Sequence, residues 1–175
     1  MVGNLVTKLS KRECFTLSEF DTLKTTSEKL QKYNVGAMPV LNKQNNDIIG
    51  IVSERDLARF IFKDEFKNDL PVTKIMTKQI ITCNLNTSVT ELMEIITHNK
   101  IRHIPIVDGK EILGIVSVGD VVNHIIEQYR DENKHLRDYI KLWKFNKVIN
   151  NKHTIHPPKV KRGIIILQII KFVNL

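Results

Sequence analysis

Two short segments combine residue types that could hold a ligand carrying both a diol and an anionic group. Each has the pattern Ser-x-x-Asp directly after a Gly-Ile-Val run, at Ser53–Asp56 and at Ser117–Asp120. If the run is a strand and the serine begins a helix, the free N–H groups and the dipole of the first turn attract an anion. A carboxylate one turn into that helix can accept hydrogen bonds from a vicinal diol. The two segments are therefore candidate binding sites.

The same pattern also has a purely structural interpretation. Ser-x-x-Asp at a helix start is close to a capping box, in which the two side chains satisfy backbone N–H groups and bind no ligand. The pattern, however, occurs twice, and each copy follows an apolar segment that contains a proline, Pro39 or Pro105. This duplicated context favours the binding interpretation.

Both segments belong to an internal repeat. Residues 34–41 align with residues 100–107 at a shift of 66, and residues 50–57 align with residues 114–121 at a shift of 64. The two shifts differ because the first copy has a longer polar turn, a place where a change of length is tolerated. We therefore expect two copies of one fold.

Each copy is expected to contain a helix, two strands and a final helix in this order. Apolar residues at three- and four-residue spacing predict the first helix of each copy, and short apolar runs predict the strands. The last helix of the second copy is expected to run to about Tyr139. A unit of ~60 residues buries little core by itself, so the two copies should pack together as an α/β pseudo-dimer with two equivalent clefts.

These motifs resemble the CBS domain, which is found in tandem as a Bateman module, and in particular the small bacterial stand-alone CBS-pair proteins. The resemblance rests on Ser53–Asp56, Ile75–Thr77, Arg102–Ile106 and Gly114–Val122. It implies tandem β-α-β-β-α repeats that pack with pseudo-twofold symmetry. The expected domains are repeat 1 at residues 5–66, repeat 2 at residues 72–140 and a basic tail at residues 141–175.

The resemblance also implies a ligand and two composite clefts. In CBS pairs the acidic side chain of the motif accepts hydrogen bonds from the ribose hydroxyls of an adenine nucleotide, and the strand of one repeat faces the Ser-x-x-Asp of the other. Cleft 1 is then expected to consist of Ser53, Arg55, Asp56, Thr87, Ile101, Arg102 and His103. Cleft 2 is expected to consist of Val35, Gly36, Ala37, Ser117, Gly119 and Asp120, with Asp21 in the place of Thr87.

The two clefts are expected to differ in affinity for phosphate. Cleft 1 has two arginines and a histidine, and cleft 2 is expected to have none of these. Charge-assisted hydrogen bonds should therefore make cleft 1 the tighter site for a nucleotide phosphate. The alternative for Arg55 and Arg102 is that they are solvated or ion-paired surface residues.

The net charge of +8 comes from one end of the chain. Residues 141–175 contain eight Lys and Arg and no acidic residue, so basic and acidic residues balance over residues 1–140. In this tail the basic residues alternate with aromatic ones, a pattern that can suit nucleic acid or an anionic membrane. A poorly ordered basic tail is the simpler interpretation.

The sequence also limits the function. It contains none of the hydrolase, zinc-protease or P-loop motifs, and we expect no catalytic residues, no metal and no required cofactor. The sequence predicts a cytoplasmic protein. Its two cysteines are isolated, and it has neither a signal-peptide core nor an apolar run long enough to span a bilayer.

We therefore expect a regulatory signal-transduction module rather than an enzyme. Its regulatory ligand would be an adenine nucleotide (AMP, ADP, ATP or NAD), its assembly a homodimer, and its output would pass to an unknown protein target. The alternatives are a scaffold whose tail binds nucleic acid or anionic membrane, and a detached regulatory piece of an enzyme related to inosine-monophosphate dehydrogenase.

Overall fold

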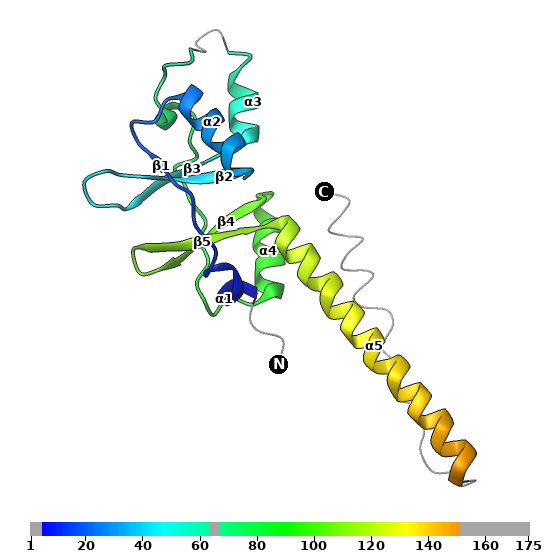
Figure 1. Ribbon diagram of the computed structural model, residues 1–175. Helices are drawn as coiled ribbons and strands as arrows, with labels where there is room; N and C mark the ends of the chain where they lie inside the picture. The colour runs from blue at the N-terminus through cyan, green and yellow to red at the C-terminus, as the bar shows by residue number, and fades with distance from the viewer. Residues whose placement is uncertain (1–4, 64–66, 151–175) are drawn as a thin grey trace.

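The computed structural model describes residues 5–63 and 67–150, with residues 143–150 described by their backbone alone. Two similar α/β units lie side by side, and a long helix leaves the second (Figure 1). The first unit contains β1 (Leu17–Ser18), α2 (Leu23–Tyr33), β2 (Ala37–Leu41), β3 (Ile48–Ser53) and α3 (Glu54–Phe60). The second contains α4 (Val89–Asn99), β4 (His103–Asp108), β5 (Glu111–Ser117) and α5 (Val118–Asn150). The expected tandem α/β repeat is confirmed.

The sheets of the two units have the same register. In the first unit β1 is parallel to β2, and β2 is antiparallel to β3. In the second unit β4 is antiparallel to β5, and a single parallel bridge between Cys83 and Ile106 occupies the place of β1. This bridge lies 66 residues after the pairing of Leu17 with Val40. The β-α-β-β-α order is therefore complete in the first unit, while the first strand of the second is reduced to one bridge.

The first helix of each unit ends in the same backbone conformation. Asn34 and Lys100 cap α2 and α4 with φ of 51° and 53°, in the left-handed region that stops a helix. Asn adopts this region readily, whereas Lys does so at some cost. The cap turns the chain directly into the segment before β2 or β4. Both segments form walls of the clefts described below.

The structural units differ from the sequence repeats at their edges, because short N-terminal elements are exchanged. Helix α1 (Leu5–Leu9) begins the first repeat but packs in the core of the second unit, where Val6 is fully buried. The 3-10 turn η1 (Val72–Lys74) begins the second repeat but packs in the core of the first unit, where Val72 is fully buried. Each core therefore needs residues from both copies, so neither repeat is a complete folding unit.

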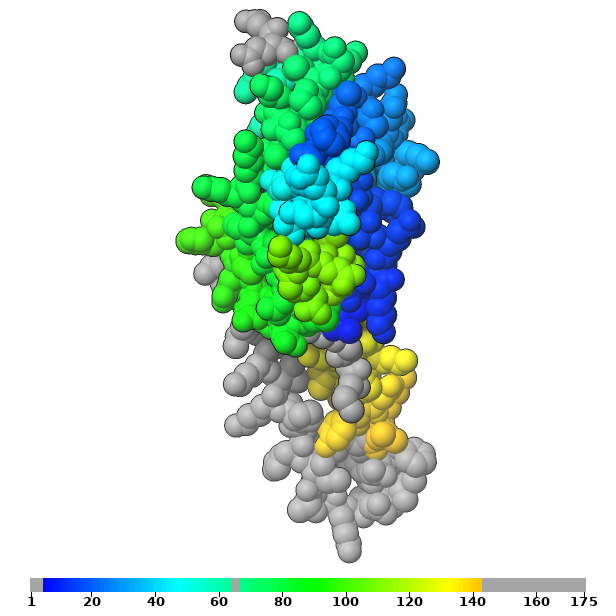
Figure 2. Space-filling view, turned by 90° about the vertical axis from the view of Figure 1, so that its left-hand side faces the viewer, coloured from blue at the N-terminus to red at the C-terminus, as the bar shows by residue number. Residues whose placement is uncertain are grey.

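The two hairpin turns also meet. The space-filling view shows the turn of the first hairpin, in cyan, next to the turn of the second, in yellow-green (Figure 2). Lys110 Nζ lies 3.5 Å from the carboxylate of Asp47, which joins the turns by an exposed ion pair. A surface pair of this kind contributes little stability.

Helix α5 begins in the core and ends far from it. Val121 is buried against the second core, and the helix then projects from the body (Figure 1). It extends to Asn150, beyond the end expected near Tyr139, so the expected boundary at residue 140 falls inside a helix. No helix of the described part of the chain is long and apolar enough to cross a membrane. Most of the expected basic tail, residues 151–175, lies outside the described residues.

Candidate functional site

Cleft 1 lies between the two units and has a volume of about 220 Å³. The junction of β3 and α3 forms one wall, the chain just before β4 forms another, and the segment from Thr77 to Ile81 closes the side. The structure thus brings together residues that are far apart in sequence. Of the residues predicted for this cleft, those that line it are Ser53, Arg55, Asp56, Ile101, Arg102 and His103.

Asp56 caps helix α3 with only one of its oxygens. Oδ2 accepts hydrogen bonds from the N–H and the hydroxyl of Ser53, at 2.9 and 2.6 Å. Oδ1 has no hydrogen bond or ion pair with any described residue. The capping and binding interpretations of this motif are therefore compatible, because the cap leaves one oxygen available to a ligand.

Cleft 1 is rich in basic side chains. Arg55, Arg59 and Arg102 all line it, and none of them forms an ion pair with a described residue. Arginine side chains bind phosphate through paired hydrogen bonds. The cleft therefore offers a carboxylate oxygen and several guanidinium groups to the same occupant.

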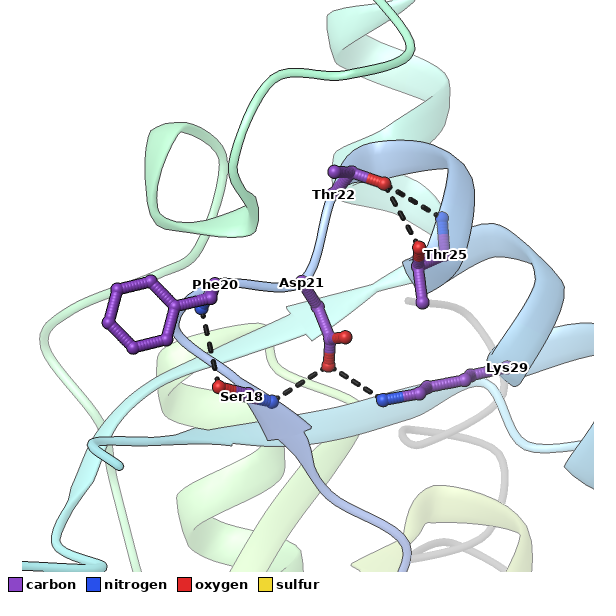
Figure 3. A network of polar contacts seen from close by, with 6 residues as sticks. All are labelled: Ser18, Phe20, Asp21, Thr22, Thr25 and Lys29. Carbon is purple, nitrogen blue, oxygen red and sulfur yellow. Dashed lines mark hydrogen bonds and ion pairs between the residues drawn. The ribbon is translucent and has the colours of Figure 1, made fainter. Parts of the chain in front are cut away.

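Thr87 is the one predicted residue that does not line cleft 1. Its Oγ1 accepts a hydrogen bond of 3.1 Å from the N–H of Asn84 and so closes a turn before α4. Asp21 does the same in the first unit, where its carboxylate binds Ser18 N at 2.8 Å and Lys29 Nζ at 2.7 Å (Figure 3). Asp21 and Thr87, which are 66 residues apart, are therefore equivalent residues that each close a turn.

Cleft 2 has a volume of about 320 Å³ and is related to cleft 1 by the repeat. The chain before β2 forms one wall, and the junction of β5 and α5 forms the other. Gly119 and Asp21, both predicted for this cleft, are not among its lining residues. The other predicted residues all line it: Val35, Gly36, Ala37, Ser117 and Asp120.

Asp120 differs from Asp56 because both of its oxygens are engaged. Oδ2 accepts hydrogen bonds from the N–H and hydroxyl of Ser117, at 3.0 and 2.5 Å, and Oδ1 pairs with Nη1 of Arg12 at 2.8 Å. Burial acts to raise the pKa of Asp120, but the hydrogen bonds from Ser117 and Arg12 outweigh it and lower the pKa below its usual value. Asp120 is therefore a carboxylate already paired with a cation.

The expectation that cleft 2 lacks an arginine and a histidine is wrong. Arg12 and His103 both line it. Arg12 lies in the exchanged segment after α1, and the shift of 66 aligns it with Lys78, just after the Ile75–Thr77 motif. This alignment is the one feature of the sequence that pointed to Arg12 as a cleft residue. It does not reveal that Arg12 packs against the second unit.

A shared wall separates the clefts, because Gly36, Ala37 and His103 line both of them. Nε2 of His103 lies 3.1 Å from the point where a Cβ on Gly36 would be, so the glycine permits this close approach. Burial lowers the pKa of His103. No group of three or more potential metal ligands occurs among the described residues.

Both repeats match a known family model. The CBS domain model matches residues 5–63 and 72–127. The mitochondrial CBS domain-containing protein CBSX3 of Arabidopsis thaliana is 35% identical over 124 residues, which cover 69% of this chain and 60% of the relative. The chain thus matches less than two thirds of that protein's length.

Solved structures of CBS-domain proteins are similar to this fold. The CBS-domain containing protein ATU1752 from Agrobacterium tumefaciens has a TM-score of 0.62 at 28% identity, covering 68% of this chain and 94% of that one. The CBS domain pair of protein MJ0100, in complex with 5′-methylthioadenosine and S-adenosyl-L-methionine, has a TM-score of 0.64 at 19% identity, covering 73% of this chain and 99% of that one. With two matched repeats and two composite clefts, this chain belongs to the CBS-domain family.

Proposed function

We propose that this protein is a regulatory sensor that binds an adenine nucleotide (AMP, ADP, ATP or NAD) in cleft 1. The observation that carries the proposal is Oδ1 of Asp56, a carboxylate oxygen without a described partner, in a cleft lined by arginines that form no ion pair with a described residue. The output is a change of shape or assembly passed to a protein target.

Each part of a nucleotide has a matching group in cleft 1. Oδ1 of Asp56 would accept hydrogen bonds from the ribose hydroxyls. Arg55 and Arg102 would donate charge-assisted hydrogen bonds to the phosphate. Ile80 and Ile101 line the cleft and would give the adenine ring an apolar surface. The complex of MJ0100 supports the ligand class, because both of its ligands contain adenosine.

Cleft 2 is proposed to be the weaker site. A ribose that binds Asp120 must share or displace the guanidinium of Arg12, which lies 2.8 Å from Oδ1. At Asp56, no described residue competes for Oδ1. We therefore retain the assignment of cleft 1 as the tighter site, but now for the availability of its carboxylate as well as for its arginines.

Calorimetry of the full chain with AMP, ATP and NAD tests the proposal. Asp56→Asn retains the size of the side chain but removes its charge, and we expect the dissociation constant of the tighter site to rise about 10- to 100-fold, the value of a hydrogen bond to a charged group. Asp120→Asn should leave that site unchanged. Asp108→Asn, at an exposed strand end, is the matched control.

Two results would contradict the proposal at different levels. If Asp120→Asn removes the tighter site and Asp56→Asn does not, the assignment of the clefts is wrong. If none of the three nucleotides binds or raises the melting temperature, the ligand class is wrong, since a ligand of the folded state must raise that temperature.

A further inference from the structure

Helix α5 carries two different apolar faces. The first packs on the core of the second unit and includes Val118, Val121 and Ile125. The second, which we call the seam, continues along the part of the helix that projects from the body (Figure 1). The residues of the seam follow one another at alternating steps of four and three: Val122, Ile126, Tyr129, Asn133, Leu136 and Ile140.

Three apolar side chains of the seam are exposed to solvent, and those of Val122 and Leu136 are half-buried. Ile126 is 37% exposed, Tyr129 is 44% exposed and Ile140 is 43% exposed. An exposed apolar row on a projecting helix is unfavourable in water unless another surface covers it. The seam therefore needs an occupant.

The spacing of the seam identifies the kind of occupant. Steps of four and three form a heptad repeat, in which Ile126, Asn133 and Ile140 occupy the a positions and Tyr129 and Leu136 occupy d positions. Ile at a with Leu at d favours a two-stranded coiled coil, and a single Asn at a fixes the register and number of helices. The sequence position of Trp143 continues the d series.

The flanking charges select the direction of the second helix. Glu132 is at a g position and Arg137 is at the following e position. In a parallel pair, g of one helix faces the next e of the other, so Glu132 would face Arg137 of the partner subunit. In an antiparallel pair the e positions face each other, and these hold Arg130 and Arg137, which would repel.

We propose that the seam is a parallel two-stranded coiled coil between two copies of this chain. The contact is isologous, with Asn133 of each copy facing the same residue of the other. The basic tail of the same chain is a poorer occupant, because residues 151–175 have no acidic residue and the e positions of the seam are basic. The pairing does not depend on nucleotide and would bring the two C-terminal tails to one end of the assembly.

Sedimentation equilibrium of the full chain tests the pairing. The wild type is expected to be a dimer at micromolar concentration, and Leu136→Glu with Ile140→Glu is expected to be a monomer. The matched control is Leu142→Glu on the same helix, because Leu142 is 62% exposed but lies outside the a and d positions. This control should remain a dimer. Melting of each variant would show that the body stays folded.

A charge exchange and a cross-link test whether the two helices of the pair are parallel. Arg137→Glu and Glu132→Arg should each raise the dimer dissociation constant about tenfold, because each places like charges at two equivalent contacts, and the double exchange should restore it. Asn133→Cys should give a disulfide-linked dimer only in a parallel, in-register pair. A monomeric wild type, or a dimer that the seam variants leave intact, would overturn the proposal.

Discussion

The two clefts contain the same motif in different electrostatic states. In cleft 1, Asp56 caps its helix with one oxygen and leaves the other without a described partner. In cleft 2, Asp120 forms the same cap, but its second oxygen pairs with Arg12. The caps are alike because both motifs begin a helix directly after a strand.

The difference comes from outside the repeated motif. Arg12 follows α1, which packs against the second unit, so an N-terminal residue reaches Asp120. The corresponding exchanged segment places Thr77, Gln79 and Ile80 along cleft 1, and none of these can pair with a carboxylate as a cation. Internal duplication therefore preserves the helix cap, while the exchanged segments decide whether the carboxylate is available.

The largest expected effect is on phosphate binding in cleft 1. Arg55→Ala with Arg102→Ala should raise the dissociation constant for AMP about 100-fold, because two hydrogen bonds to charged groups are lost, and should change that for adenosine much less. Calorimetry with the two ligands separates phosphate binding from sugar binding. Lys24→Ala, at an exposed ion pair, is the control. An equal loss for both ligands would show that the arginines shape the cleft and do not bind phosphate.

A change in the shared wall should affect both clefts. Gly36→Ala would place a Cβ 3.1 Å from Nε2 of His103, so the imidazole must move. We expect the free energy of unfolding to fall by about 1 kcal/mol, the lower end for overpacking, and ligands to bind more weakly in both clefts. Urea unfolding measures the first effect. In the control Gly119→Ala the nearest atom is 3.5 Å away, so stability should hold or rise.

A smaller effect is expected when the cation is removed from cleft 2. Arg12→Ala would free Oδ1 of Asp120, and the affinity of this cleft for adenosine should rise up to about fivefold, since an exposed pair is worth at most about 1 kcal/mol. Calorimetry in the Asp56→Asn background isolates the second site. Lys11→Ala, an exposed neighbour, serves as the control. A fall in affinity would instead make Arg12 a contact of the ligand.

The local sequence pattern was sufficient to predict the fold and most of the residues that line the two clefts. The repeated Gly-Ile-Val-Ser run predicted each strand-to-helix junction, and the helix spacing predicted α2 and α4. The exchange of α1 and η1 was not predicted, because it depends on which core buries Val6 and Val72, and both are ordinary apolar residues in the sequence. The extension of α5 was missed because its apolar positions after Tyr129 lie among charged ones.

The electrostatics of cleft 2 could not be predicted from the sequence. Arg12 is remote from Asp120 in the chain and outside the resembling motifs, so only the folded structure reveals the pair. Thr87 was expected in cleft 1 from its place in the repeat, but a side chain that closes a turn is directed by its own backbone. The expected affinities of the two clefts remain predictions.

The last expected effect is a pH dependence of stability at His103, which lines both clefts. Burial lowers its pKa from 6.5; Glu54 and Asp120 oppose this shift, and Arg102 and Arg55 add to it. The unfolded chain therefore binds the proton more readily, so stability is lost as the pH falls below about 6.5, with a slope of at most ~1.4 kcal/mol per pH unit.

His103→Asn should remove this dependence between pH 7.5 and pH 5.5, as measured by urea unfolding. Asp120 does not contribute in this range, because its lowered pKa moves its own titration below 3.8. His98→Asn, on the surface of α4, is the matched control and should retain the wild-type slope. If stability instead rises as the pH falls, His103 is charged in the folded protein, and the shared wall of the two clefts carries a cation that both ligands would meet.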